Sequence, residues 1–124
     1  MRLFLIVAAV ALAASSGANA QRTAWRNSTP YTGQWIADIC GSEQVEDTLA
    51  CYSFLKGLID GLSLSQAVFD NQSLICPPDN VTLEQERRVV AKYGRDNPGE
   101  LHLMAAMLVV NAIQTTWPCE AKRD

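Results

Sequence analysis

The chain is poor in the side chains that carry enzyme chemistry. It contains one histidine, His102, and no Gly-x-Ser-x-Gly element around a serine. Nucleophilic catalysis needs a base beside an exposed nucleophile, and a tetrahedral zinc site needs several histidine or cysteine ligands. We therefore expect no catalytic residues, no metal site and no cofactor. His102 is interpreted as a half-buried, hydrogen-bonded residue in the first turn of an apolar helix.

The chain also lacks clustered positive charge and a long apolar run beyond its N-terminus. Ten Lys and Arg residues stand against thirteen Asp and Glu residues, without a basic stripe. Binding to a phosphate backbone depends on clustered cations that replace its counterions. The longest later apolar stretch, residues 103–113, has eleven residues, which is too short to cross a bilayer. We expect no nucleic-acid partner and no membrane insertion after signal cleavage.

The N-terminal segment has the organisation of a secretory signal peptide. A basic start is followed by the apolar stretch 3–14 and by small residues that end at Ala20. This pattern predicts cleavage after Ala20, and its alanine-rich composition is typical of bacterial export to the periplasm. We expect three parts: a signal peptide over 1–20, a flexible lead-in over 21–30 and a helical domain over 31–120.

Helical signals run through the rest of the chain, and no alternating strand pattern lies between turn residues. Capping residues mark three helix starts, namely Thr32, Thr82 with Gln85, and Asn97 with Pro98. The apolar period predicts helices over residues 33–40, 47–69, 83–93 and 98–116. We expect an all-α fold, a small up-and-down bundle of about four helices with two disulfides.

Four cysteines lie in the mature chain: Cys40, Cys51, Cys76 and Cys119. An even number in a small exported domain indicates disulfides rather than metal or redox chemistry. Four cysteines allow three pairings. In an up-and-down bundle, Cys40 and Cys51 lie at one end, and Cys76 and Cys119 lie at the other. The topology therefore predicts the disulfides Cys40–Cys51 and Cys76–Cys119.

Two glycines, Gly57 and Gly61, lie one turn apart inside the predicted second helix. Each lowers helix propensity by about 1 kcal/mol relative to alanine. The favoured interpretation is the close approach of another helix at a place where a side chain would not fit. The alternative is a flexible point near a binding surface.

The best candidate for a binding site is the connection between the second and third predicted helices, residues 70–80. It is tied by Cys76 and stiffened by Pro77 and Pro78, and a rigid loop loses little entropy on binding. The residues expected to contact a partner are its polar ones, Asp70, Asn71, Gln72, Asp79 and Asn80. The alternative interpretation is an ordinary helix connection.

Short motifs spread over residues 31–119 occur in a characteristic order. They are Tyr31-Thr32-Gly33, Cys40-Gly41-Ser42, Cys51 to Asp60, Cys76-Pro77, Val81 to Gln85, Val89-Val90, Tyr93, Pro98, Leu101-His102, Ala105, Leu108-Val109, Ala112 and Trp117-Pro118-Cys119. In order and spacing they resemble the immunity proteins of type VI secretion amidase effectors, the Rap/Tai family.

The resemblance implies a small α-helical periplasmic protein that binds a peptidoglycan amidase effector and blocks its cleft with a loop or helix face. It implies no catalysis and no cofactor, and it extends to a homodimer, which some members form. The alternative function is a periplasmic acid-stress chaperone of the HdeA-like kind. Thirteen acidic residues would make such a chain sensitive to low pH through charge imbalance.

Overall fold

The computed structural model describes residues 31–70 and 72–120. This part of the chain forms four α-helices and one short 3-10 helix, which are α2 (Gly33–Gly41), α3 (Val45–Phe69), α4 (Leu83–Asp96), η2 (Pro98–Glu100) and α5 (Ala105–Thr116). No named strand occurs within it, and the one β-bridge joins Thr32 to Met104. The all-α class and the number of α-helices are confirmed. The predicted signal peptide and lead-in lie outside the described residues.

The first three predicted helices occur close to their expected limits. Thr32 caps α2, since its hydroxyl oxygen accepts a hydrogen bond from the amide of Trp35 at 3.2 Å. Thr82 and Gln85 form the predicted capping box at the start of α4. α4 continues to Asp96, beyond the predicted end at residue 93. Local capping chemistry therefore places both helix starts correctly.

The fourth predicted helix is wrong in its first half. Instead of one helix over 98–116, the chain forms η2, then an irregular stretch, and α5 begins only at Ala105. The irregular stretch serves the start of α2, where the amides of Gly33 and Gln34 donate to the carbonyls of Leu103 and Leu101 at 2.7 and 2.8 Å. Those first-turn amides have no partner within α2. Hydrogen bonding of these two amides to the carbonyls of Leu101 and Leu103 is therefore favoured over a helix that would run from residue 98 to residue 116.

Two residues near this break differ from expectation. Asn97 is the N-cap of the short η2, with Pro98 after it as predicted, but its side chain makes no capping bond there. The side-chain amide of Asn97 instead donates to the carbonyl of Tyr93 at 2.9 Å and closes the end of α4. His102 lies in the irregular stretch and is exposed. The prediction of a half-buried histidine in a helix is therefore wrong, because the helix does not form there.

The core is built from all four α-helices. Its largest fully buried side chains are Ile36, Leu55, Leu108, Ile113, Val90 and Val109. α2 and α4 approach closely at Gly94, where an added Cβ would lie 2.5 Å from the Cβ of Ala37. A Cβ at Gly33 would lie 3.0 Å from the carbonyl oxygen of Glu100. The close approach of neighbouring segments therefore occurs at Gly94 and Gly33.

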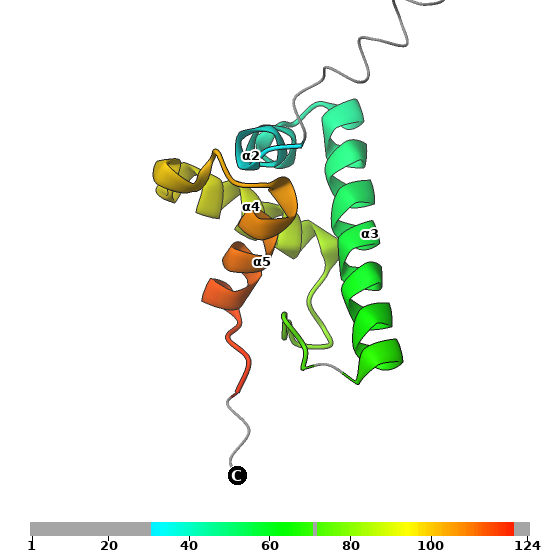
Figure 1. The fold of residues 1–124 in the computed structure, drawn as a ribbon. Coiled ribbons are helices and arrows are strands. Elements are labelled where there is room, and N and C mark those ends of the chain that lie inside the picture. Colours follow the sequence, from blue (N-terminus) through cyan, green and yellow to red (C-terminus); the bar gives the residue numbers. More distant parts are fainter. Residues whose placement is uncertain (1–30, 71, 121–124) are drawn as a thin grey trace, which may run out of the picture. The chain divides into compact units, whose positions relative to one another are not determined.

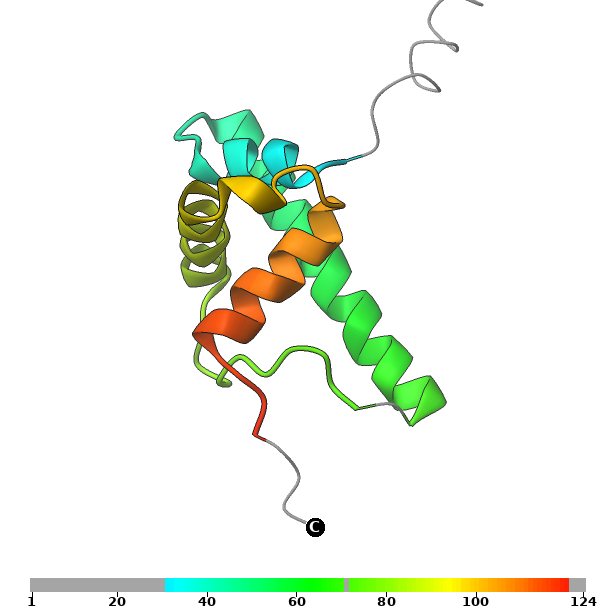
Figure 2. The same cartoon turned by 60° about the vertical axis from the view of Figure 1, so that its left-hand side comes forward.

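At Gly57 and Gly61, by contrast, the predicted helix approach is wrong. An added Cβ at either glycine would meet no atom within 4 Å in the described part of the chain. Figures 1 and 2 show that α3 is longer than its neighbours and runs beyond them. The open space at the glycines has another cause, because they lie on a different side of α3 from the buried Cys51 and Leu55. Both glycines are exposed. The helix propensity that α3 loses at these two glycines is not compensated by packing within the described part of the chain.

Both predicted disulfides are present. Cys40 pairs with Cys51 and joins α2 to α3, with their Cα atoms 5.2 Å apart. Cys76 pairs with Cys119 and joins the segment before α4 to the chain after α5, with Cα atoms 5.1 Å apart. Among the described residues, none of the helices has the length and apolar character needed to cross a membrane.

Candidate partner-binding surface

The predicted binding segment starts where α3 ends. Asp70 is the C-cap of α3 and takes a left-handed conformation with φ 50°. Such a conformation is uncommon outside glycine, although aspartate and asparagine adopt it more readily than most residues. Asp70 thus stops the helix and turns the chain away from its axis. In Figure 2 the following segment runs between the lower ends of α3 and α5.

Several contacts anchor the middle of this segment. The side-chain amide of Gln114 on α5 donates to the carbonyl of Leu74 at 2.6 Å, and the hydroxyl of Ser73 donates to the carbonyl of Ile75 at 2.5 Å. Ile75 is buried in the core, and the next residue, Cys76, is held by its disulfide. The chain is thus attached to the scaffold just after the turn at Asp70, which limits the entropy lost on binding.

The predicted contact residues do not form one patch. Gln72 lines a small cleft of about 180 Å³ together with Leu62, Ser65, Gln66 and Leu74. Asp70 is exposed at the end of α3 beside this region, whereas Asp79 and Asn80 are exposed at the other end of the segment, before α4. Asn71 lies outside the described residues. Of the five predicted contact residues, only Asp70 and Gln72 are therefore described at the end of the segment that carries the cleft.

Sequence reasoning missed the apolar part of this surface. Phe69 is 69% exposed and Leu74 is 53% exposed, and the two residues flank Asp70 and Gln72 in the chain. Phe69 is the last residue of α3, and no sequence pattern indicated that its side chain is exposed. We use the name loop surface for Phe69, Asp70, Gln72 and Leu74 together with the cleft. It combines exposed apolar side chains with polar groups, as the centres of protein interfaces do.

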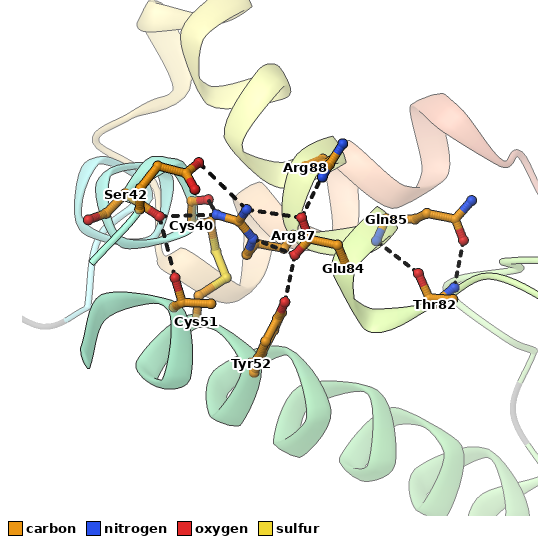
Figure 3. Close-up of polar contacts among 11 residues, drawn as sticks. Cys40, Ser42, Cys51, Tyr52, Thr82, Glu84, Gln85, Arg87 and Arg88 are labelled. Carbon is orange, nitrogen blue, oxygen red and sulfur yellow. Dashed lines mark hydrogen bonds and ion pairs between the residues drawn. A yellow bond between two sulfur atoms is a disulfide. The ribbon is translucent and has the colours of Figure 1, made fainter. Parts of the chain in front are cut away.

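A second hollow, of about 460 Å³, lies between the end of α2 and α4, and Figure 3 shows the polar network beside it. The guanidinium of Arg87 donates to the carbonyls of Cys40 at 2.8 Å and Ser42 at 3.1 Å, and forms two hydrogen bonds with Glu84 at 2.7 and 3.0 Å. The hydroxyl of Tyr52 donates to Glu84 at 2.6 Å. Arg87 thereby satisfies carbonyls at the end of α2, and the network of Arg87, Glu84 and Tyr52 joins α2, α4 and α3.

The same network shifts the pKa values of Glu84 and Tyr52. The hydrogen bonds from Arg87, Tyr52 and Arg88 hold the pKa of Glu84 far below its ordinary value. The hydrogen bond to Glu84 raises the pKa of Tyr52. Each charge is stabilised by a partner of opposite sign or by a donor, so the arrangement favours permanent ionisation over proton transfer. The network therefore fits a structural clamp better than an acid–base site.

Glu86, also on α4, has the opposite environment. Its side chain is only 6% exposed, and burial raises the pKa of its carboxyl group, while Lys56 on α3 acts in the other direction. In the described part of the chain, no group of three or more His, Cys, Asp and Glu side chains is placed to hold a metal ion. Neither Glu86 nor Glu84 therefore belongs to a candidate metal site.

Comparison with known proteins assigns the chain to a family. A family model described as Rap1a immunity proteins matches residues 32–119, which is most of the sequence and nearly all of the described helical region. Searches of curated proteins and of solved structures each found no match. The matched range agrees with the motifs from Tyr31 to Cys119 that indicated the resemblance. The chain therefore belongs to the Rap1a immunity protein family.

Proposed function

We propose that this protein is a periplasmic immunity protein that binds and occludes a type VI secretion peptidoglycan amidase, and so protects the producing cell. Membership of the Rap1a immunity family supports an immunity role. The signal-peptide pattern of residues 1–20 and the two disulfides support an oxidising, exported location. Inhibition by binding needs neither catalysis nor a cofactor.

The proposed site of inhibition is supported by one observation: the loop surface is exposed, and the segment that bears it is attached to the core. Phe69 and Leu74 offer large apolar side chains, and Asp70 and Gln72 offer polar groups beside them. Because the segment is attached to the core at Ile75 and Cys76, it can enter an enzyme cleft without much loss of entropy. We propose that these four residues block substrate access. The predicted contacts Asp79 and Asn80 form the margin of this proposed interface, and Asn71 stays a sequence-based prediction.

The test uses the oxidised mature chain, residues 21–124, as bait in envelope and secreted extracts at neutral pH. The eluted partner is assayed for cleavage of purified peptidoglycan with increasing amounts of bait. The proposal expects one partner that cleaves peptidoglycan and is silenced at a stoichiometric amount of bait. An eluted hydrolase that stays active, or broad capture of unfolded proteins after acidification, would contradict it, and the latter would favour the acid-stress chaperone.

The position of the interface is tested by a matched pair of substitutions. Leu74→Asp lies on the loop surface, and Leu49→Asp changes another exposed leucine at the opposite end of α3. Truncation of a central apolar contact commonly costs more than 1 kcal/mol of binding energy. We expect Leu74→Asp to weaken amidase inhibition at least tenfold and Leu49→Asp to leave it unchanged. Equal inhibition by both variants would place the interface elsewhere.

The proposed working form is a homodimer, as the resemblance implied. A dimer would present two loop surfaces and could hold two effector molecules.

A further inference from the structure

The hollow between the end of α2 and α4 is lined with more cations than anions, although the protein as a whole is acidic. The chain has a formal net charge of -3 at pH 7. The charged residues that line the hollow are nevertheless mostly basic, namely Arg87, Arg88, Lys92 and Arg95 against Glu43 and Glu84. Neither the core nor the loop surface uses this excess of positive charge.

Helix geometry brings the exposed cations to one side of α4. Arg88, Lys92 and Arg95 follow each other at intervals of four and three positions, which places their side chains along the same side of a helix. They extend over about 10 Å, since each helical residue rises about 1.5 Å. All three are exposed. The sequence contains no basic run at this place, because the cations gather only when the helix forms.

The internal partners of these cations hold them weakly. Arg88 pairs with Glu84 and Lys92 pairs with Asp96, and the two cationic side chains are 74% and 70% exposed. Exposed ion pairs of this kind contribute little to stability, because water screens them. Arg95 has no ion-pair partner in the described part of the chain. The three side chains can therefore turn towards a ligand at little cost to the fold.

Arg87 adds a buried donor to the same hollow. A guanidinium has five N–H groups, and Arg87 uses four of them, two for carbonyls at the end of α2 and two for Glu84. One N–H on Nη2 therefore has no hydrogen-bond acceptor among residues 31–70 and 72–120. The carboxylate of Glu43 lies 3.8 Å from Nη2, which is too far for a hydrogen bond. A ligand carboxylate at a shorter distance would satisfy this donor.

The floor of the hollow is formed by small residues. Gly41 at the end of α2 and Ala91 on α4 both line it, and a Cβ added at Gly41 would lie 3.9 Å from the Cβ of Ala91. The two helices therefore meet there without a large side chain between them. The open space of about 460 Å³ falls within the range of about 300–1,000 Å³ that small-ligand sites occupy. The hollow thus has room for a short piece of polymer.

One local effect opposes an anion in this place. The last carbonyls of a helix carry a partial negative charge, and those of α2 lie beside the hollow. Arg87 offsets this charge, because its guanidinium donates to the carbonyls of Cys40 and Ser42. The remaining cations along α4 then determine the sign of the ligand.

We propose that this hollow binds a short acidic peptide, whose carboxylates pair with the three exposed cations of α4 and with the free N–H of Arg87. Bonds of this kind between cations and carboxylates are short and strong. An extended peptide advances about 3.3 Å per residue, so about three residues span the row of cations. Cations spread along a helix match several carboxylates on one chain better than they match a single small anion. The site is separate from the loop surface and does not depend on amidase inhibition.

Binding of tetraglutamate tests the chemistry of the ligand. The oxidised mature chain, residues 21–124, is titrated into fluorescently labelled tetraglutamate at low ionic strength, and fluorescence anisotropy is followed. We expect saturable binding that weakens with added salt, because exposed charges are screened, and no binding of tetraglutamine. Unlabelled tetraglutamate should displace the probe at a much lower concentration than inorganic phosphate. Absence of binding, or equal displacement by phosphate, would overturn the assignment of a peptide.

A matched pair of lysine variants tests the position of the site. Lys92 and Lys56 are both exposed and both form an ion pair with an aspartate one turn later, but only Lys92 lines the hollow. We expect Lys92→Gln to raise the dissociation constant of tetraglutamate about fivefold or more, and Lys56→Gln to leave it nearly unchanged. Glu43→Gln should lower it, since a like charge near Arg87 is removed. Equal effects of the two lysine variants would mean unspecific attraction and contradict the proposal.

A variant that fills the hollow tests its shape without changing any charge. Gly41→Leu places a side chain on the floor, where the Cβ position has room, and Gly99→Leu changes another exposed glycine with an open Cβ position. We expect Gly41→Leu alone to weaken tetraglutamate binding, and urea denaturation should show both variants to be folded. Unchanged binding by a folded Gly41→Leu would place the peptide elsewhere and overturn the proposal. Both variants keep the loop surface, so this outcome would leave the proposed inhibition untouched.

Discussion

At the scale of one residue, Gly94 shows that a closely packed neighbouring helix can require a glycine. It lies inside α4, where glycine is unfavourable, and yet the site is buried against Ala37 of α2. Arg87, two turns earlier on the same side, is also buried, and its guanidinium donates to the carbonyls of Cys40 and Ser42. Both residues allow α2 to end against α4 without a clash or an unpaired carbonyl.

Replacement of Gly94 by alanine should therefore be destabilising although alanine favours helix. The new methyl group would lie 2.5 Å from the Cβ of Ala37, so α2 and α4 would have to move apart. Overpacking of this kind typically costs about 1–3 kcal/mol. Urea denaturation should show this loss for Gly94→Ala and almost none for Gly99→Ala, whose Cβ position is open. An equally stable Gly94→Ala would mean that the helices are less tightly packed.

At the scale of elements, the two disulfides act on different parts of the molecule. Cys40–Cys51 joins residues 11 apart and fixes the short turn between α2 and α3. Cys76–Cys119 joins residues 43 apart and ties the loop surface to the end of α5, next to the contact between Gln114 and Leu74. The second disulfide therefore controls the shape of the proposed inhibitory segment as well as stability.

Removal of the second disulfide should thus affect binding as well as folding. The loop-closure model gives a loss of about 4 kcal/mol for Cys76→Ser/Cys119→Ser and about 3 kcal/mol for Cys40→Ser/Cys51→Ser. We expect the first double variant to weaken amidase inhibition more strongly than the second, at a temperature where circular dichroism shows both to be folded. Equal inhibition would indicate that Ile75 and the hydrogen bond to Leu74 are enough to shape the segment.

At the scale of the whole molecule, two neighbouring glutamates on α4 give opposite contributions to acid stability. The folded-state pKa of Glu84 is lowered by the hydrogen bond from Arg87 above all, so its stabilising contribution is present above about pH 4.5 and is lost as the pH falls. The folded-state pKa of Glu86 is raised by burial, so the folded state loses stability as the pH rises through that value.

Glutamine variants separate these contributions. Glu84→Gln should lower the free energy of unfolding at pH 7, and its difference from the wild type should shrink below pH 4, where the unfolded carboxyl group is protonated. Glu86→Gln should raise the free energy of unfolding at pH 7, and its difference should vanish below about pH 4.5. Urea denaturation between pH 3 and pH 7 measures both. The same sign of change at pH 7 for the two variants would contradict the environments described.

Much of the fold could be predicted because it depends on neighbours in the sequence. The capping box of Thr82 and Gln85, the period of α3 and the cysteine spacing act over a few residues or follow from helix order. The candidate site was predicted only in part. Asp70 and Gln72 were found as polar loop residues, whereas Phe69 and Leu74 were not, since nothing local shows that their apolar side chains stay exposed.

The sequence by itself determined the helical class, the starts of α2 and α4, the disulfide partners and the family to which the chain belongs. Only the tertiary structure decided where the last helix begins, because the amides of Gly33 and Gln34 claim carbonyls almost seventy residues later in the chain. It also decided which glycines are buried, at Gly94 and not at Gly57. Burial and hydrogen bonding between distant segments depend on packing, and a pattern read along one chain does not contain that information.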